Sequence, residues 1–124
     1  MATWETAVVQ RLAQAGHKLG SYKTKTPKQI YEQIIEGAAT LIDVRNQNEW
    51  EKGHLPNAHH LMLGYLQPEA AQFICDKPII VQCQSGARSA VGASILKAMG
   101  ATDVTNLKGG YIGWRIAGLP MVQE

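Results

Sequence analysis

The stretch that most constrains the fold is "PIIVQC", residues 78–83, which is followed by a glycine-containing loop. A continuous apolar run of this length is typical of a parallel strand that is buried on both faces. Gly86 can take the positive φ angle that a tight loop requires, and the composition of residues 89–100 indicates a helix that ends at Gly100. The chain therefore predicts a strand–loop–helix unit with Cys83 at the carboxyl end of the strand.

Strand-like and helix-like segments alternate along the rest of the chain. Thr26 is expected to cap a helix that begins with Pro27 and ends just before Gly37. Further strands are expected at the end of residues 17–26 and within residues 39–45, 58–62 and 103–110, and further helical segments within residues 46–53, 68–76, opened by Pro68, and 111–118. This alternation predicts an α/β fold with a parallel five-stranded sheet that is flanked by helices on both faces. Functional sites of such sheets form outside the carboxyl ends of the strands, where Cys83 is expected.

The N-terminal segment has a different pattern. Trp4, Val8 and Leu12 recur at helical spacing, and Gly16 ends the repeat, which predicts a short amphipathic helix. We expect residues 1–25 to form this helix and a connector, and residues 26–124 to form the main domain. The segment lacks the basic opening and the long apolar core of a secretion signal, so a cytoplasmic location is expected.

Composition excludes several classes of partner and cofactor. The 124 residues carry a net charge of only +2 and no dense run of Lys or Arg, so a nucleic-acid partner is not expected. No apolar stretch approaches the roughly 20 residues of a membrane span. The two cysteines, Cys75 and Cys83, form no Cys-x-x-Cys motif, and neither a metal nor another cofactor is expected. Cys75 follows Phe73 and Ile74 and is interpreted as a packing residue.

The residues after Cys83 favour a thiolate, which is the nucleophilic form of cysteine. The following helix directs the positive end of its dipole at the loop, and loop N–H groups can surround an anion. Arg88 adds a full positive charge. A lone cysteine is more often a packing residue, but this combination indicates that Cys83 is chemically active.

Three motifs resemble those of the rhodanese family of sulfurtransferases. "CQSGARS" resembles the active-site loop of that family, Cys-x-x-Gly-x-Arg-Ser, and "LIDVRNQNEWEKGHLPNAHHL" and "NLKGGYIGWRIAGLP" resemble the signatures that precede and follow it. The resemblance covers about residues 26–120 with the motifs in family order. It implies a rhodanese-like fold and transfer of a sulfane sulfur from a donor, such as thiosulfate or a persulfide, to cyanide or a thiol through a persulfide on Cys83. It also implies that the sulfur is bound by the residues that follow: Gln84, Ser85, Gly86, Ala87 and Arg88.

Two alternatives compete with this interpretation. Related phosphatases have a loop of the form Cys-x5-Arg, whereas only four residues separate Cys83 from Arg88, so phosphatase activity is not favoured. The second alternative is a non-catalytic sulfur carrier or regulatory module that serves a partner enzyme. A partner or fused sulfide-oxidising enzyme is left open, as is the choice between a monomer and a weak dimer.

Several polar residues outside the loop have expected roles. Asp43 is expected either to support the site, by contacting the active loop or by orienting Arg88, or to have a purely structural role. Arg45 is expected to pair with Glu49 and fasten the strand to the next turn. His54 is read as a turn residue and not as a catalytic base. Adjacent strand residues point to opposite faces, so His59 and His60 cannot bind one metal together. The side chains of Trp50 and Trp114 are expected to pack.

Overall fold

The computed structural model describes residues 22–66, 70–73 and 77–122. The predicted N-terminal helix and Cys75 lie outside these residues. No helix in the described ranges is both long enough and apolar enough to cross a membrane. In chain order the elements are β1 (Lys23–Lys25), α2 (Pro27–Ile35), β2 (Thr40–Asp43), α3 (Gln47–Glu51), β3 (Ala58–His60), η1 (Leu63–Tyr65), η2 (Ala71–Phe73), β4 (Ile79–Gln82), α5 (Ala87–Ala98), β5 (Val104–Leu107) and α6 (Gly110–Ile116).

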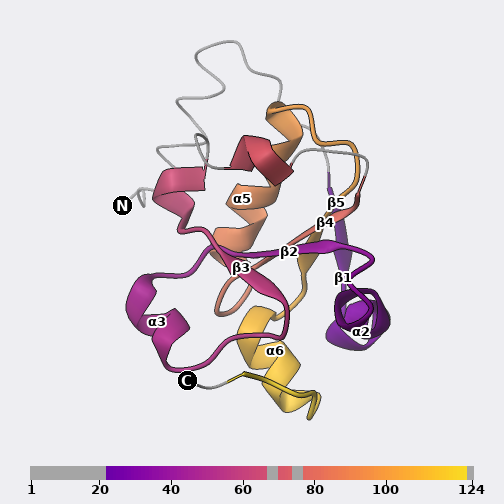
Figure 1. Ribbon diagram of the computed structural model, residues 1–124, viewed down its shortest axis with the longest axis vertical. Helices are drawn as coiled ribbons and strands as arrows, with labels where there is room; N and C mark the ends of the chain where they lie inside the picture. The colour runs from indigo at the N-terminus through magenta and orange to yellow at the C-terminus, as the bar shows by residue number, and fades with distance from the viewer. Residues whose placement is uncertain (1–21, 67–69, 74–76, 123–124) are drawn as a thin grey trace.

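The strands of the described residues form a five-stranded sheet in the order β1-β5-β4-β2-β3, and every pairing is parallel (Figure 1). The predicted α/β class and parallel sheet are therefore confirmed. In the register between β2 and β4, Asp43 lies opposite Gln82. The residues that follow these two strands, Val44 and Cys83, consequently leave the sheet side by side at its carboxyl edge.

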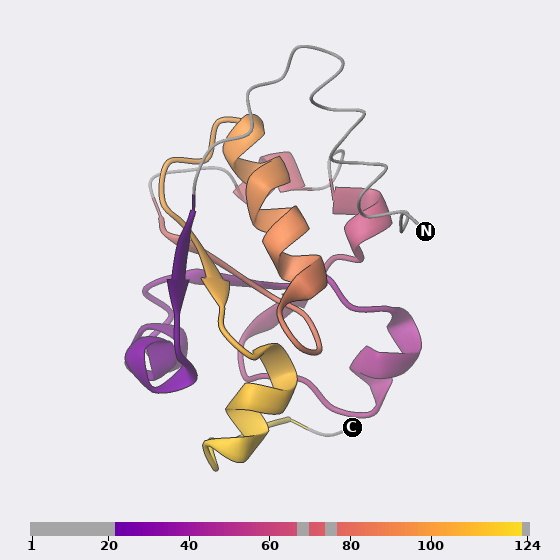
Figure 2. The same ribbon diagram turned by 180° about the vertical axis from the view of Figure 1, so that it is seen from behind.

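Each face of the sheet packs against its own helices. In both ribbon views α5 lies on one side of the sheet, while α2 and α6 lie on the other (Figure 1, Figure 2). Successive strand residues alternate between the faces. Val81 and Cys83 belong to the core cluster that includes Leu96 of α5, whereas Ile80 belongs to the cluster that includes Ile30 of α2 and Trp114 of α6.

The predicted helix boundaries are largely confirmed. Thr26 caps α2 and forms a capping box with Gln29, Pro27 is the first helical residue, and Gly37 follows the helix with a φ of 70°. The helix α5 ends before Gly100, which has a φ of 109°. The helix expected over residues 68–76 is only partly described, and its described part contains the short 3-10 helix η2.

Candidate active site

Cys83 is the first residue after β4 and lies at the floor of a short loop. Its side chain is buried, with 1% of the residue exposed. Gly86 has a φ of 113°, in the left-handed region that favours glycine, and its N–H donates to Cys83 Sγ at 3.0 Å. The loop thus turns back on its own cysteine, and Gly86 adopts the positive φ that the sequence predicted.

The first turn of α5 adds further backbone donors to this loop. Gly86 is the N-cap and Ala87 is the first helical residue. The first N–H groups of a helix have no carbonyl partner within that helix, and the positive end of the helix dipole lies there. The loop and the first turn of α5 therefore present several N–H groups near Cys83.

The first turn of α6 binds the backbone carbonyl groups of the loop. Tyr111 N–H donates to the carbonyl oxygen of Cys83 at 2.8 Å, and Ile112 N–H donates to that of Gln84 at 3.0 Å. Gly110 has a φ of 55°, and a Cβ atom there would collide with the Cys83 carbonyl oxygen. The double glycine in "NLKGG" thus permits a close backbone approach. The sequence interpretation missed this role, although the paired glycines were the signal.

Ser89 and Asn106 form a second support that the sequence interpretation missed. The hydroxyl of Ser89 lies 2.5 Å from Asn106 Oδ1, 3.1 Å from the Gly86 carbonyl oxygen and 3.3 Å from Cys83 Sγ. Asn106 Nδ2 also donates to the Gly86 carbonyl oxygen at 3.3 Å. A serine has one hydroxyl proton, so only one of the three acceptors receives a full hydrogen bond at a time. Asn106 on β5 therefore helps to orient the Ser89 hydroxyl beside the sulfur.

The ion pairs differ from those expected. Arg45 pairs with Asp43, from Nη2 to Oδ2 at 2.9 Å and from Nε to the same oxygen at 3.0 Å, and not with Glu49. Glu49 instead accepts two hydrogen bonds from Arg88, at 2.7 and 2.9 Å. The guanidinium of Arg88 lowers the pKa of Glu49 below its ordinary value of 4.5, against the opposing effect of burial.

Alternation along β2 explains the correction for Asp43. Leu41, two residues earlier, packs in the α2 and α6 cluster, so Asp43 emerges on that face, whereas Arg88 belongs to α5 on the other. Asp43 therefore does not orient Arg88. It reaches the active loop only through Arg45, whose Nη1 donates to Gln84 Oε1 at 3.2 Å.

His54 and His60 have structural contacts. His54 stacks on Trp50 with ring centroids 3.6 Å apart, and its Nδ1 lies 3.1 Å from the Leu55 carbonyl oxygen. His60 Nε2 lies 2.7 Å from the Arg45 carbonyl oxygen. The described ranges contain no group of three or more His, Cys, Asp or Glu side chains that could hold a metal ion. Trp114 is fully buried, as expected, and its Nε1 donates to the Pro120 carbonyl oxygen at 2.7 Å.

Comparisons with known proteins show the family of the chain. The sequence model of the rhodanese-like domain family matches residues 26–117 of the chain. The uncharacterized protein YqhL of Bacillus subtilis (strain 168) is 41% identical over 96 residues, which span 75% of this chain and 76% of the relative. The thiosulfate sulfurtransferase GlpE of Haemophilus influenzae (strain PittEE) is 38% identical over 103 residues, which span 82% of this chain and 95% of GlpE. A crystal structure of a rhodanese-related protein from Thermoplasma volcanium superposes with a TM-score of 0.76 at 29% identity, over 83% of this chain and 100% of that one.

The parallel α/β sheet and the similarity to this solved structure define a rhodanese-like fold. The chain belongs to the rhodanese-like domain family. The relatives that match the chain include proteins named as sulfurtransferases.

Proposed function

We propose that the protein transfers a sulfane sulfur from thiosulfate or a related donor to cyanide or a thiol, with Cys83 carrying the sulfur as a persulfide. The observation that carries the proposal is the hydrogen bond from Gly86 N–H to Cys83 Sγ within a loop of further backbone donors. Such fixed N–H groups stabilise negative charge on sulfur without reorganising during the reaction. The thiosulfate sulfurtransferase name of GlpE also supports the proposal.

The first half-reaction forms the persulfide. The Cys83 thiolate attacks the outer sulfur of thiosulfate, the sulfur–sulfur bond of the donor breaks, and sulfite leaves with the electron pair. Thiosulfate and thiolate are both anions, so the N–H groups at the start of α5 are needed to offset their repulsion. The same donors would hold the outer sulfur of the persulfide.

The second half-reaction returns the free cysteine. Cyanide or a thiolate attacks the outer sulfur, the bond to Sγ breaks, and the electron pair remains on Cys83 as the thiolate. No proton has to be relayed to a leaving group, so the proposed reaction does not need a histidine base; the ring nitrogens of His54 and His60 contact backbone carbonyl oxygens. Two separated half-reactions give ping-pong kinetics.

The test combines intact mass with steady-state activity. Incubation with thiosulfate should increase the mass of the wild-type protein by one sulfur atom, and cyanide should remove it with formation of thiocyanate. Cys83→Ser should abolish both the mass increase and thiocyanate formation, whereas Cys75→Ser should retain most of the activity. Equal activity in the two single variants would refute the assignment.

The alternative is a sulfur carrier or regulatory module that serves a partner enzyme. A carrier would load sulfur on Cys83 but release it to small acceptors only slowly, whereas a regulatory module would not load at all. The mass and turnover measurements therefore separate these possibilities.

A further inference from the structure

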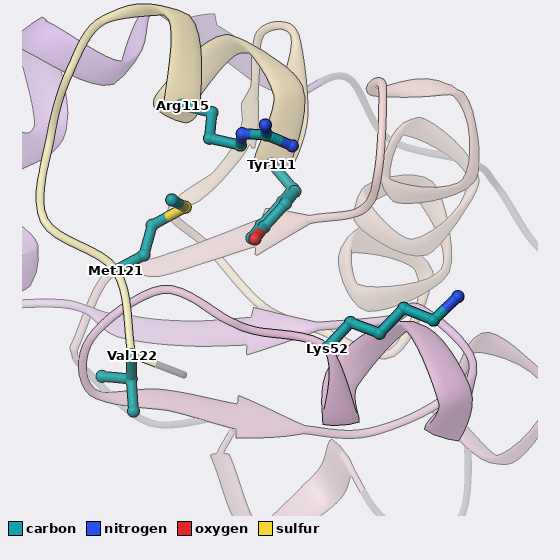
Figure 3. A pocket seen from close by; sticks show the side chains of 5 residues that line it. All are labelled: Lys52, Tyr111, Arg115, Met121 and Val122. Atoms are coloured by element: carbon teal, nitrogen blue, oxygen red, sulfur yellow. The ribbon is translucent and has the colours of Figure 1, made fainter. Parts of the chain in front are cut away.

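Two adjoining hollows lie beside the active loop. One has a volume of about 320 Å³ and reaches the loop at Gln84, the residue after Cys83. The other has a volume of about 380 Å³ and extends to Met121 and Val122 (Figure 3). Both hollows are lined by Lys52, Tyr111 and Arg115, so they form one depression. Each volume lies within the roughly 300–1,000 Å³ of ligand pockets.

The depression is electropositive. The charge of Arg45, which lines the inner hollow, is offset by Asp43, and the charge of Glu49 is offset by Arg88. Within the described part of the chain, Lys52 and Arg115 have no carboxylate partner. A single exposed cation is usually only solvated. Here two cations of separate elements border the same depression, with Arg115 projecting from α6 and Lys52 from the segment after α3 (Figure 3).

The residues around the depression are held by contacts with other parts of the protein. The guanidinium of Arg45 lies 4.4 Å from the centroid of the Tyr111 ring. The Tyr111 hydroxyl lies so close to Gly53 that a Cβ atom there would be 2.9 Å from it. On the outer side, Val122 and His54 exchange two backbone hydrogen bonds of 2.8 Å. The backbone N–H of Tyr111 also donates to the Cys83 carbonyl oxygen. Tyr111 therefore both lines the depression and contacts the active loop.

We propose that this depression binds the tail of the sulfur acceptor, and that the acceptor is an organic thiol with a carboxylate group. The inference rests on the proposed function. An inorganic donor would be held by the loop amides and would leave the depression empty, whereas a thiol that attacks the outer sulfur must place the rest of its carbon skeleton beside the loop. Lys52 and Arg115 select a negative group, and the guanidinium of Arg115 matches a carboxylate in geometry. Met121 and Val122 offer apolar contacts to methylene groups.

The step is a simple displacement. The acceptor thiolate attacks the outer sulfur of the Cys83 persulfide and forms a new sulfur–sulfur bond. The bond between that sulfur and Sγ breaks, and its electron pair stays on Cys83. The products are the Cys83 thiolate and the persulfide of the acceptor, without net oxidation or reduction.

The experiment compares 3-mercaptopropionate, which carries a carboxylate, with 2-mercaptoethanol, a neutral thiol of similar size. Cys83 is first loaded with thiosulfate, and kcat/KM for each thiol is then measured in the wild type, in the double variant Lys52→Gln/Arg115→Gln and in Lys28→Gln. Lys28 is an exposed residue of α2 that does not line the depression, so Lys28→Gln is a control for the loss of a positive charge elsewhere on the surface. In the double variant we expect kcat/KM to fall roughly fivefold or more for 3-mercaptopropionate and less than about twofold for 2-mercaptoethanol. Added salt should reduce the difference between the thiols in the wild type and not in the double variant.

The possible failures are distinguishable. If neither thiosulfate nor a persulfide donor loads Cys83 in the wild type, both the proposed function and this inference are wrong. If Cys83 loads but the double variant loses equal activity with both thiols, or with neither, the proposed function stands and the acceptor site is wrong. A loss of the same size in Lys28→Gln would also contradict the acceptor site, since it would mean that net charge alone controls the rate.

Discussion

The backbone N–H of Tyr111 donates to the carbonyl oxygen of Cys83 at 2.8 Å, so the first turn of α6 holds the residue that carries the candidate nucleophile. The two residues are far apart in the sequence and meet because β4 and β5 are neighbours in the sheet. The position of the cysteine backbone therefore depends on the C-terminal part of the chain as well as on its own loop.

Replacement of Gly110 should damage this contact. Gly110→Ala adds a methyl group that collides with the Cys83 carbonyl oxygen, and it also places a side chain at a φ of 55°. We expect the free energy of unfolding to fall by roughly 1–3 kcal/mol and sulfur transfer to fall further than the stability loss explains. Gly118→Ala is the matched control, because Gly118 has a φ of 74° but no atom within 4 Å of its added Cβ. Urea unfolding and thiocyanate formation of the two variants give the comparison, and equal effects would show that the collision is unimportant.

The hydroxyl of Ser89 should matter more than that of another serine on the same helix. Ser89→Ala leaves the buried Oδ1 of Asn106 without its hydroxyl donor and removes the hydroxyl next to Cys83 Sγ, whereas the Gly86 carbonyl oxygen keeps other donors. We expect a loss of about 1–3 kcal/mol in stability and slower persulfide formation from thiosulfate. Ser94→Ala removes only a hydrogen bond to the Ala90 carbonyl oxygen in the same helix and should change both quantities little. Loading rates by mass spectrometry that are alike in the two variants would contradict a role for Ser89 at the sulfur.

The Glu49–Arg88 pair should make stability depend on acid pH. Arg88 lowers the pKa of Glu49 in the folded state, so the pair stabilises the fold at pH values above the ordinary 4.5. This contribution should disappear as the pH falls from there through the lowered pKa, because the carboxylate then becomes protonated. We expect Glu49→Gln to cost about 1 kcal/mol or less at neutral pH, since the pair is partly exposed, and nearly nothing well below pH 4.5. Urea midpoints of wild type and variant across this range provide the measurement; a difference that grows toward acid pH would overturn the expectation.

The length of the loop should favour sulfur transfer over phosphate hydrolysis. Four residues separate Cys83 from Arg88, and inserting one glycine after Ser85 would enlarge the ring and displace Gly86 N–H from Sγ. We expect thiocyanate formation to fall roughly tenfold or more in the insertion variant. The same insertion between Thr102 and Asp103, in the connection from α5 to β5, should have a much smaller effect. Robust hydrolysis of an aryl phosphate by the unmodified protein would show that the loop-length argument is wrong.

The sequence alone determined the order of the described strands and α-helices, the parallel α/β class and the position of Cys83 at the end of β4. These features depend on local patterns: the continuous apolar run of β4, the capping residues of α2 and the glycine after Cys83, which must adopt a positive φ. Gly86 and Gly100 could be assigned to turns because glycine adopts a positive φ without the steric cost that a side chain brings.

Only the tertiary structure decided which charged and polar groups meet. Arg45 has carboxylates both two residues before it and four residues after it, and sequence spacing did not indicate its choice of Asp43. Glu49 and Arg88 are 39 positions apart, and their pairing depends on how α3 lies against the start of α5. The approach of Gly110 to Cys83 and of Asn106 to Ser89 likewise follows from the strand order, in which β5 lies beside β4. Such pairings depend on three-dimensional distances between distant segments, whereas periodicity and capping report only on neighbours along the chain.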